Sequence, residues 1–174
     1  MGKDSFTELF WQFQPPLYLY LYRMCGSKET AEELLQETFY RAMLSLRARD
    51  MKYARAWLYK VARHLCIDWL RKRSGEAAMI QAVACQSTGV SSFRTPEEAL
   101  SIGEERRTIS EAMAMMPEHY RSILYLREIE GFSYEELGET LDIPLGRVKV
   151  NLHRSREKFR QLLARTEERM NDDE

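Results

Sequence analysis

Glycine and proline are scarce in this sequence. The 8 glycines and 5 prolines make up about 7% of the chain, against roughly 12% in average usage. Because both residues interrupt helices, their scarcity predicts long helices. A chain of 174 residues is long enough for one ordinary domain or for two small ones of roughly 60 to 70 residues each.

Cysteine is also sparse, and none lies in a pattern that typically holds a metal. Cys25, Cys66 and Cys85 are odd in number and form no C-x-x-C pair, so we expect reduced thiols in a cytosolic protein. His64 and Cys66 are two residues apart, and such positions do not face each other on a helix. We therefore expect no metal site and no cofactor.

Long apolar runs are absent as well. No stretch approaches the ~18 uncharged residues that a membrane-spanning helix needs, and "MGKDSFTELFWQFQ" at the start shows no signal peptide. These absences predict a soluble, cytoplasmic protein without membrane insertion.

Net charge is close to neutral at −1, but the charges are segregated. Residues 41–73 contain ten Lys or Arg against two Asp, and residues 146–165 contain seven Lys or Arg against one Glu. The balancing acids lie mainly in 29–37, 97–105 and 128–142. Segregation of this kind predicts two separate surfaces that face polyanions.

An irregular stretch divides the chain into two dense segments. Residues 76–95 mix small residues with Ser, Thr and Gly and keep no steady period, which predicts a flexible linker with a partial helix possible over 76–84. The "TPEE" that ends this region forms a helix start. We therefore expect an all-α fold, with two small helical domains, 1–75 and 96–174, joined by the linker.

The first segment shows two helical patterns before residue 47. "PPLYLYLYRMCG" alternates leucine with tyrosine as a strand would, but Pro16 before it and Gly26 after it favour a helix of about ten residues. Residues 27–46 place an apolar stripe at helical spacing, formed by Leu35, Phe39, Ala42 and Leu46. The opposite side carries Glu33, Gln36, Glu37 and Tyr40.

The second segment closes with two helices joined by a short turn. Ser133 caps the first helix, Glu136 completes a capping box, and Gly138 leaves room for close approach. An Ile–Pro pair then breaks the chain, and the last helix is expected to bury Val148, Leu152, Phe159 and Leu163. This arrangement is typical of a helix-turn-helix, whose second helix enters the DNA major groove.

The outward side of that last helix suits duplex DNA. Arg and Asn can bind guanine and adenine edges with paired hydrogen bonds, Val can contact a thymine methyl, and distal cations suit phosphates. The residues expected at this surface are Ser133, Arg147, Lys149, Val150, Asn151, Arg154 and Lys158, flanked by His153, Arg156 and Arg160. The alternative is a solvated basic helix in a bundle.

Residues 53–73 form the other basic helix, and here cations alternate with aromatic rings. Its exposed side is expected to carry Lys60, Arg63, Lys72 and Arg73 with Tyr53, Trp57 and Tyr59, and its core side Leu58, Val61, Ala62, Leu65 and Trp69. Cations beside rings suit single-stranded or opening DNA, where unpaired bases stack. The alternative is that both tryptophans belong to the core. A chain with one surface for duplex DNA and another for opening the strands, joined by a linker, suggests a role in transcription initiation.

Two long motifs carry a family resemblance. "AEELLQETFYRAM" with "RAWLYKVARHLCIDWLRKR" resembles region 2 of the extracytoplasmic-function sigma factors, a group of the sigma-70 family. "MPEHYRSILYLREIEGFSYEELGETLDIPLGRVKVNLHRSREKFRQLL" is similar to region 4 of the same family. The resemblance implies a promoter-specificity subunit of bacterial RNA polymerase, with an anti-sigma factor as a further partner.

The resemblance also implies roles for particular residues. Region 2 would bind the β′ clamp helices of the polymerase core through Glu33, Gln36, Glu37 and Tyr40. It would recognise and melt the −10 element through Arg49, Lys52, Tyr53, Trp57, Lys60, Arg63, His64 and Arg71, with a flipped base held by the loop over 47–53. Region 4 would bind the −35 element and the β flap.

This sequence departs from the family pattern at several positions. His64 stands where Asn is usual, Gly138 where Ala is usual, Asp142 where Gly is usual and Arg147 where Thr is usual, and "KVNL" replaces a common "KSRL". These departures leave the promoter sequence open. His64 is either a DNA contact or a neutral imidazole that is packed or hydrogen-bonded.

Other classes of protein remain to be weighed. A dimeric helix-turn-helix regulator that never touches polymerase would not require residues 27–73 to bind core and open DNA, and a helical scaffold would not bind DNA at all. An enzyme fits least, since His64, His119 and His153 have no evident nucleophile or carboxylate pair beside them. We therefore expect a non-enzymatic protein without catalytic residues.

Overall fold

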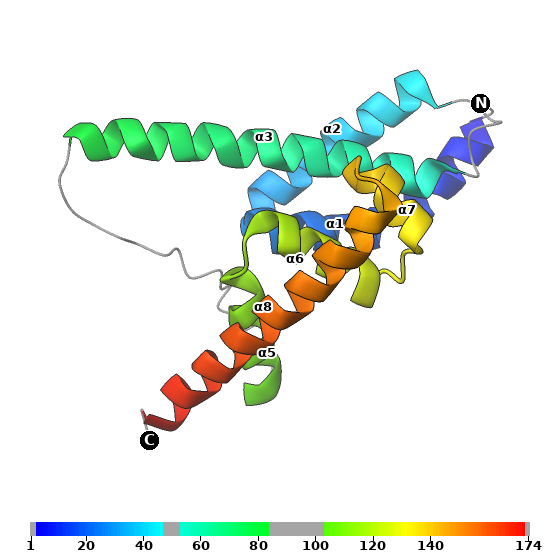
Figure 1. Ribbon diagram of the computed structural model, residues 1–174. Helices are drawn as coiled ribbons and strands as arrows, with labels where there is room; N and C mark the ends of the chain where they lie inside the picture. The colour runs from blue at the N-terminus through cyan, green and yellow to red at the C-terminus, as the bar shows by residue number, and fades with distance from the viewer. Residues whose placement is uncertain (1–2, 47–52, 84–102, 173–174) are drawn as a thin grey trace. The chain divides into compact units, whose positions relative to one another are not determined.

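The computed structural model describes residues 3–46, 53–83 and 103–172, and throughout these ranges the regular structure is helical (Figure 1). The expected all-α class is confirmed. The helices are α1 (Lys3–Cys25), α2 (Lys28–Ser45), α3 (Ala54–Val83), α5 (Glu104–Ala114), α6 (Glu118–Glu128), α7 (Tyr134–Leu141) and α8 (Leu145–Asp172).

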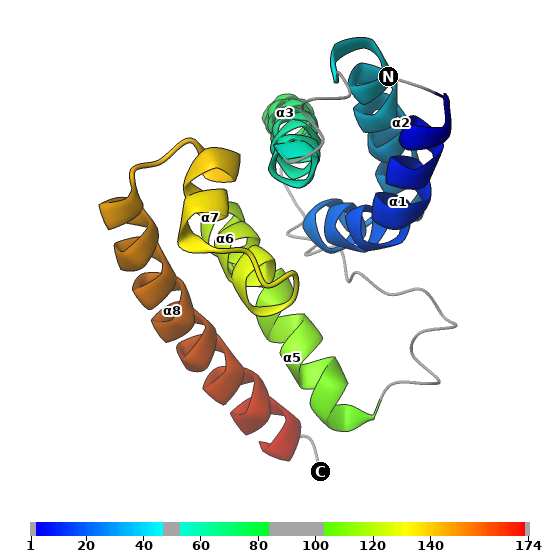
Figure 2. The same ribbon diagram turned by 90° about the vertical axis from the view of Figure 1, so that its right-hand side faces the viewer.

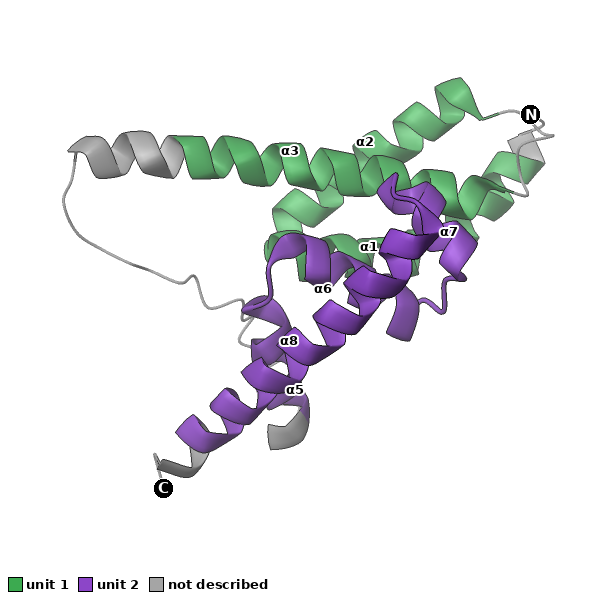
Figure 3. Cartoon of the chain, viewed as in Figure 1, with its two compact units in different colours: residues 1–92 green, residues 93–174 purple. Residues whose placement is uncertain are grey.

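The chain divides into two compact units, Met1–Ser92 and Phe93–Glu174 (Figure 3). This confirms the expectation of two small helical domains. Helix α3 continues to Val83, so the partial helix that was considered possible over 76–84 is present, and the first part of the predicted linker belongs to it. The rest of that linker and the "TPEE" helix start lie outside the described residues.

In the first unit, α1, α2 and α3 pack against one another (Figure 2). Each helix turns one apolar side toward the other two, and burial of each large side chain contributes about 1.5–3 kcal/mol. The rings of Tyr20 and Tyr59 meet at the centre, with centroids 5.3 Å apart. Other buried members are Leu17, Leu21, Ala31, Leu35, Phe39, Leu58 and Ala62.

Helix α1 corrects the prediction about its length. It begins at Lys3 rather than near Pro16, so both Pro15 and Pro16 lie inside it. A proline inside a helix costs about 3 kcal/mol, because it lacks an N–H and its ring crowds the preceding turn. The cost is offset because one face is buried on both sides of the prolines, by Leu9, Leu17 and Leu21. Gly26, with φ 74°, ends the helix as expected.

Helix α2 follows the sequence pattern closely. The Ser27 side chain accepts a hydrogen bond from the backbone N–H of Thr30 and caps the helix. The predicted stripe of Leu35, Phe39, Ala42 and Leu46 is buried throughout. This leaves the opposite side of α2 free for another role.

In the second unit, α8 packs against α5, α6 and α7, and the C-terminal part of α8 lies beside α5 (Figure 2). A core cluster of Ala112, Met116, Leu124 and Leu162 joins α5, α6 and α8. Val148 and Leu152 are buried as expected. Phe159 and Leu163 pack against the same cluster but are only partly buried, and the buried position there is Leu162.

Candidate nucleic-acid interface

The first helix of the helix-turn-helix, α7, starts with the predicted capping box. The backbone N–H of Glu136 donates to Ser133 Oγ at 3.1 Å, and the N–H of Ser133 donates to Glu136 Oε2 at 2.8 Å. These two bonds satisfy donors that the helix start would otherwise leave unpaired. The start of α7 is therefore fixed at Ser133.

The turn between α7 and α8 is tight. Asp142 adopts the left-handed conformation with φ 53°, and the N–H of Ile143 donates to the carbonyl of Gly138 at 3.1 Å. A Cβ atom on Gly138 would lie 3.1 Å from the Ile143 carbonyl oxygen, so the close approach expected at Gly138 is confirmed. Asp is one of the few non-glycine residues that tolerate the left-handed region.

Helix α8 has one buried and one outward face. Val148, Leu152 and Ser155 are buried against the rest of the unit. On the outward face Arg147, Lys149, Val150 and Arg154 are exposed, and Asn151 and Lys158 are half-buried. The structure thus brings the predicted duplex surface together on a single helix, with Ser133 at the start of the neighbouring one.

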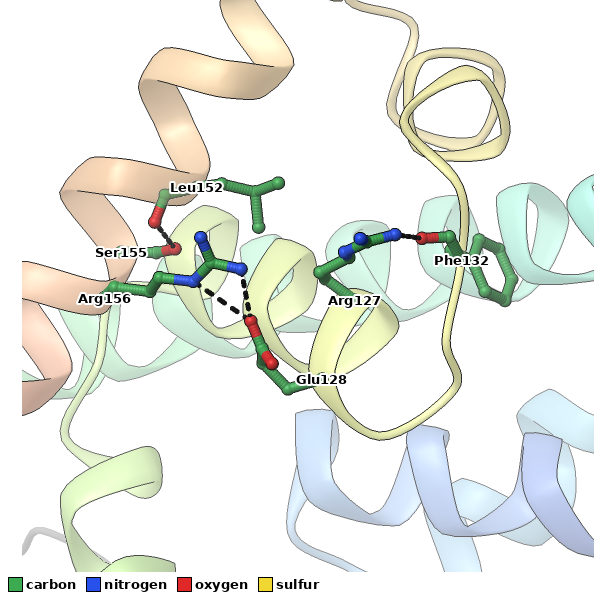
Figure 4. A network of polar contacts seen from close by, with 6 residues as sticks. All are labelled: Arg127, Glu128, Phe132, Leu152, Ser155 and Arg156. Atoms are coloured by element: carbon green, nitrogen blue, oxygen red, sulfur yellow. Dashed lines mark hydrogen bonds and ion pairs between the residues drawn. The ribbon is translucent and has the colours of Figure 1, made fainter.

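Two of the flanking cations differ from the others on α8. Arg156 is bound by Glu128 of α6, with Nη2 2.6 Å from Oε1 (Figure 4). Arg160 pairs with Glu157 on the same helix. Both were expected to be available beside the duplex surface, and the structure shows them joined to carboxylates instead.

The second basic surface, on α3, is only partly as predicted. Tyr53, His64 and Arg71 are exposed, and three further members, Trp57, Lys60 and Arg63, are half-buried. Arg49 and Lys52 lie outside the described residues. The exposed position of His64 excludes a fully packed imidazole there.

Tyr59 was expected on the exposed side of α3, and that prediction was wrong. Its relative exposure is 0%, because its ring packs against Tyr20 of α1. Trp69, expected in the core, is half-buried, and the guanidinium of Arg73 lies 5.2 Å from the centre of its ring. On this helix and just before it, Tyr53 is therefore exposed, Trp57 and Trp69 are each half-buried, and Tyr59 belongs to the core.

The outward side of α2 has a different chemistry. Glu33, Gln36 and Tyr40 are exposed as predicted, and Glu37 is half-buried, with its Oε1 2.7 Å from Arg41 Nε. The same side continues into two residues that the sequence reasoning missed, Met43 at 55% exposure and Leu44 at 67%. Their spacing of three and four residues from Tyr40 was the available signal.

Cys25 and Cys66 take no part in these surfaces, and Cys85 lies outside the described residues. Cys25 and Cys66 are buried free thiols; Cys25 donates to the Ser27 carbonyl at 3.5 Å, and burial raises the pKa of its thiol. Within the described ranges, no group of three His, Cys, Asp or Glu side chains is placed to hold a metal ion. None of the described helices is long and apolar enough to cross a membrane.

Comparison with known families decides between the possible classes. The family model for Sigma-70 region 2 matches residues 9–76, and the model for Sigma-70, region 4 matches residues 106–159. The chain belongs to the sigma-70 family. It is similar to the ECF RNA polymerase sigma factor SigW of Bacillus subtilis, with 33% identity over 169 residues, 92% of this chain and 90% of that protein. It is also 30% identical to RNA polymerase sigma factor YlaC of the same organism, over 95% of this chain and 96% of that protein.

The sigma factor is therefore of the extracytoplasmic-function type, and it directs core RNA polymerase to specific promoters to initiate transcription. A regulator that ignores polymerase is not favoured, since it would not require the region 2 match. The fold resembles that of sigma factor RpoE solved in complex with the anti-sigma factor NepR from Bartonella quintana. The TM-score is 0.69 at 21% identity, over 92% of this chain and 98% of that one.

Proposed function

We propose that the three outward helix faces divide the work of initiation among core binding, strand opening and duplex reading. The division places region 2 within residues 1–75, a linker over 76–95 and region 4 within 96–174. The observation that carries it is the difference in chemistry between the faces: acidic and apolar on α2, basic and aromatic on α3, basic and polar on α8.

Helix α8 reads the −35 duplex. The capping box and tight turn of the helix-turn-helix fix the entry end of α8, which is the end that enters a major groove. Arg147 and Asn151 carry donors for base edges, and Val150, 46% exposed, can meet a thymine methyl. Lys149, Arg154 and Lys158 supply phosphate contacts, and Ser133 at the start of α7 supplies another.

The face of α3 with the loop before it recognises and opens the −10 element. Tyr53 and Trp57 offer rings on which unpaired bases stack, and Lys60, Arg63 and Arg71 follow the backbone. His64 lies exposed on the same helix, where an imidazole contributes a hydrogen bond. Arg49 and Lys52, which lie outside the described residues, would complete the set.

The outward side of α2 binds the β′ clamp helices. Glu33 and Glu37 would be repelled by phosphate and attracted by a basic protein helix, and Gln36 and Tyr40 lie on the same side. Met43 and Leu44 add apolar area that a protein partner can bury. Region 4 in turn binds the β flap. We therefore expect a cytoplasmic, non-enzymatic subunit that needs no cofactor.

An anti-sigma factor holds the protein inactive until a signal arrives. The support is that RpoE was solved in complex with the anti-sigma factor NepR, and that CnrH, a second protein of similar fold, was solved in complex with the cytosolic domain of CnrY. We expect the partner to cover at least one of the three faces.

Reconstitution with core polymerase tests the proposal. Transcripts sequenced from genomic DNA should start at a set of promoters that share a −10 and a −35 element. Glu37→Arg should sharply reduce co-purification with core and leave thermal stability unchanged, because Glu37 lies outside the buried stripe. Co-purification of this variant at wild-type yield in moderate salt would count against the α2 face.

A further inference from the structure

The last turn of α6 contacts both helices of the helix-turn-helix through two consecutive residues (Figure 4). Arg127 Nη1 donates to the carbonyl of Phe132 at 2.6 Å, and its guanidinium lies 5.0 Å from the centre of the Tyr134 ring. Phe132 is buried and immediately precedes the cap of α7. Arg127 therefore holds the segment that begins α7.

The next residue holds the other helix. Glu128 Oε1 accepts from both Nε of Arg156, at 3.0 Å, and Nη2, at 2.6 Å. One residue earlier on α8, Ser155 is fully buried and its hydroxyl donates to the Leu152 carbonyl. Arg156 thus leaves α8 at the edge of the buried face and reaches across to α6.

Consecutive residues can hold two helices because neighbouring positions on an α-helix point about 100° apart. Helix α6 contacts both α7 and α8, so its two last polar side chains diverge toward different neighbours. A guanidinium that directs two N–H groups at one carboxylate has its charge compensated and fewer donors left for phosphate. The pairing therefore leaves Arg156 less available to DNA than an unpaired cation on α8.

We propose that Arg127 and Glu128 hold α7 and α8 in position against α6, and that Arg156 is a positioning residue and not a phosphate ligand. This inference rests on the proposed role of α8 as the −35 reader. Arg127 sets the start of α7 and Glu128 sets the rotation of α8, so together they aim Arg147 and Asn151 at base edges. Loss of either contact reduces the preference for the −35 sequence more than it reduces the affinity for DNA in general.

Simple electrostatics predicts a different result, an unchanged ratio between specific and non-specific affinity, which makes the inference testable. Removal of a carboxylate close to DNA raises affinity for every sequence. The matched control is Glu135→Ala, which removes an exposed acid of α7 that has no ion pair among the described residues. It should raise affinity for all DNA alike.

The experiment uses holoenzyme reconstituted from core and the full chain. Affinity is measured across a salt series for a promoter duplex and for the same duplex with a scrambled −35 element. Glu128→Ala should lower the ratio of the two affinities about two- to fivefold, the range of an exposed ion pair, without weaker binding to the scrambled duplex. Arg156→Lys, which keeps the charge, should lower the ratio similarly and leave the salt slope unchanged, and Arg127→Ala should lower it as well.

Three results would overturn the inference. Glu128→Ala could behave like Glu135→Ala, with both affinities raised equally. Arg156→Lys could match wild type while Arg156→Ala lowers the salt slope by ~0.9, the signature of a lost phosphate contact. Wild-type holoenzyme itself could fail to distinguish the two duplexes, which would refute the role of α8 and this inference with it. That result is recognisable because it needs no variant, whereas the other two results refute only the inference.

Discussion

The two helices α3 and α8 are both basic, but the side chains beside their cations differ. On α3 the cations lie beside Tyr53 and Trp57, whereas the outward face of α8 places Val150 and Asn151 between Arg147 and Arg154. Cations attract DNA of any form. Rings favour unpaired bases, and hydrogen-bonding or methyl-contacting side chains favour base edges in a groove. The side chains beside the cations, and not the cations alone, therefore indicate whether each helix binds unpaired or duplex DNA.

The largest expected effect is a loss of stability, because Tyr59 of α3 belongs to the buried core and not to the DNA-binding surface. Tyr59→Ala should lower the free energy of unfolding by about 3–5 kcal/mol, because it removes a large buried ring and leaves a cavity. Thermal and denaturant unfolding of the full chain measure this loss. If Tyr59→Ala unfolded like wild type and instead lost affinity for the −10 element, Tyr59 would belong to the DNA-binding surface of α3 and not to its core.

The second prediction concerns Trp57, a half-buried ring of α3. Trp57→Ala should weaken holoenzyme binding to a single-stranded −10 oligonucleotide by about 1–3 kcal/mol, the usual worth of one base stacked on an aromatic side chain. Binding to a −35 duplex should be unchanged. A fluorescence titration with each DNA measures both, and equal loss on the two would show that Trp57 acts through folding.

The third prediction concerns the polar residues of α8. Asn151→Ala and Arg147→Ala should each cost roughly 1–3 kcal/mol of discrimination at one base pair of the −35 element, if the contact is bidentate. Competition binding against a panel of single-base substitutions in the duplex locates that base pair. A loss that is the same for every sequence would remove these residues from base reading.

The smallest effect is expected at the distal cation. Lys158→Ala should weaken binding to all sequences alike and reduce the salt slope by ~0.9, because one phosphate contact is lost. A salt series on duplexes with intact and scrambled −35 elements measures the slope. A change in base preference with an unaltered slope would reverse the roles assigned to Lys158 and Asn151.

Local rules predicted much of the helix-turn-helix. The capping box at Ser133, the close approach at Gly138 and the burial of Val148 and Leu152 depend on residues near one another in sequence, and the structure has them all. The fold class followed from the same kind of pattern, and so did the outward position of Glu33, Gln36 and Tyr40 on α2.

Contacts between helices distant in sequence were not predictable in this way. Tyr59 is buried because Tyr20 of α1 lies opposite it, and Arg156 is paired because α6 presents Glu128. The start of α1 was misplaced because a proline pair normally marks a helix start, and here leucines on both sides of the pair are buried. Each error arose where a tertiary contact outweighed a local preference.

One measurement tests the division between the two DNA surfaces most directly. Wild-type, Trp57→Ala and Asn151→Ala holoenzymes are each titrated with a single-stranded −10 oligonucleotide and with a −35 duplex. Trp57→Ala should lose affinity only for the single strand, and Asn151→Ala only for the duplex. If either variant lost affinity for both DNAs, or each lost affinity for the DNA assigned to the other, the assignment of α3 to open DNA and α8 to duplex DNA would be contradicted.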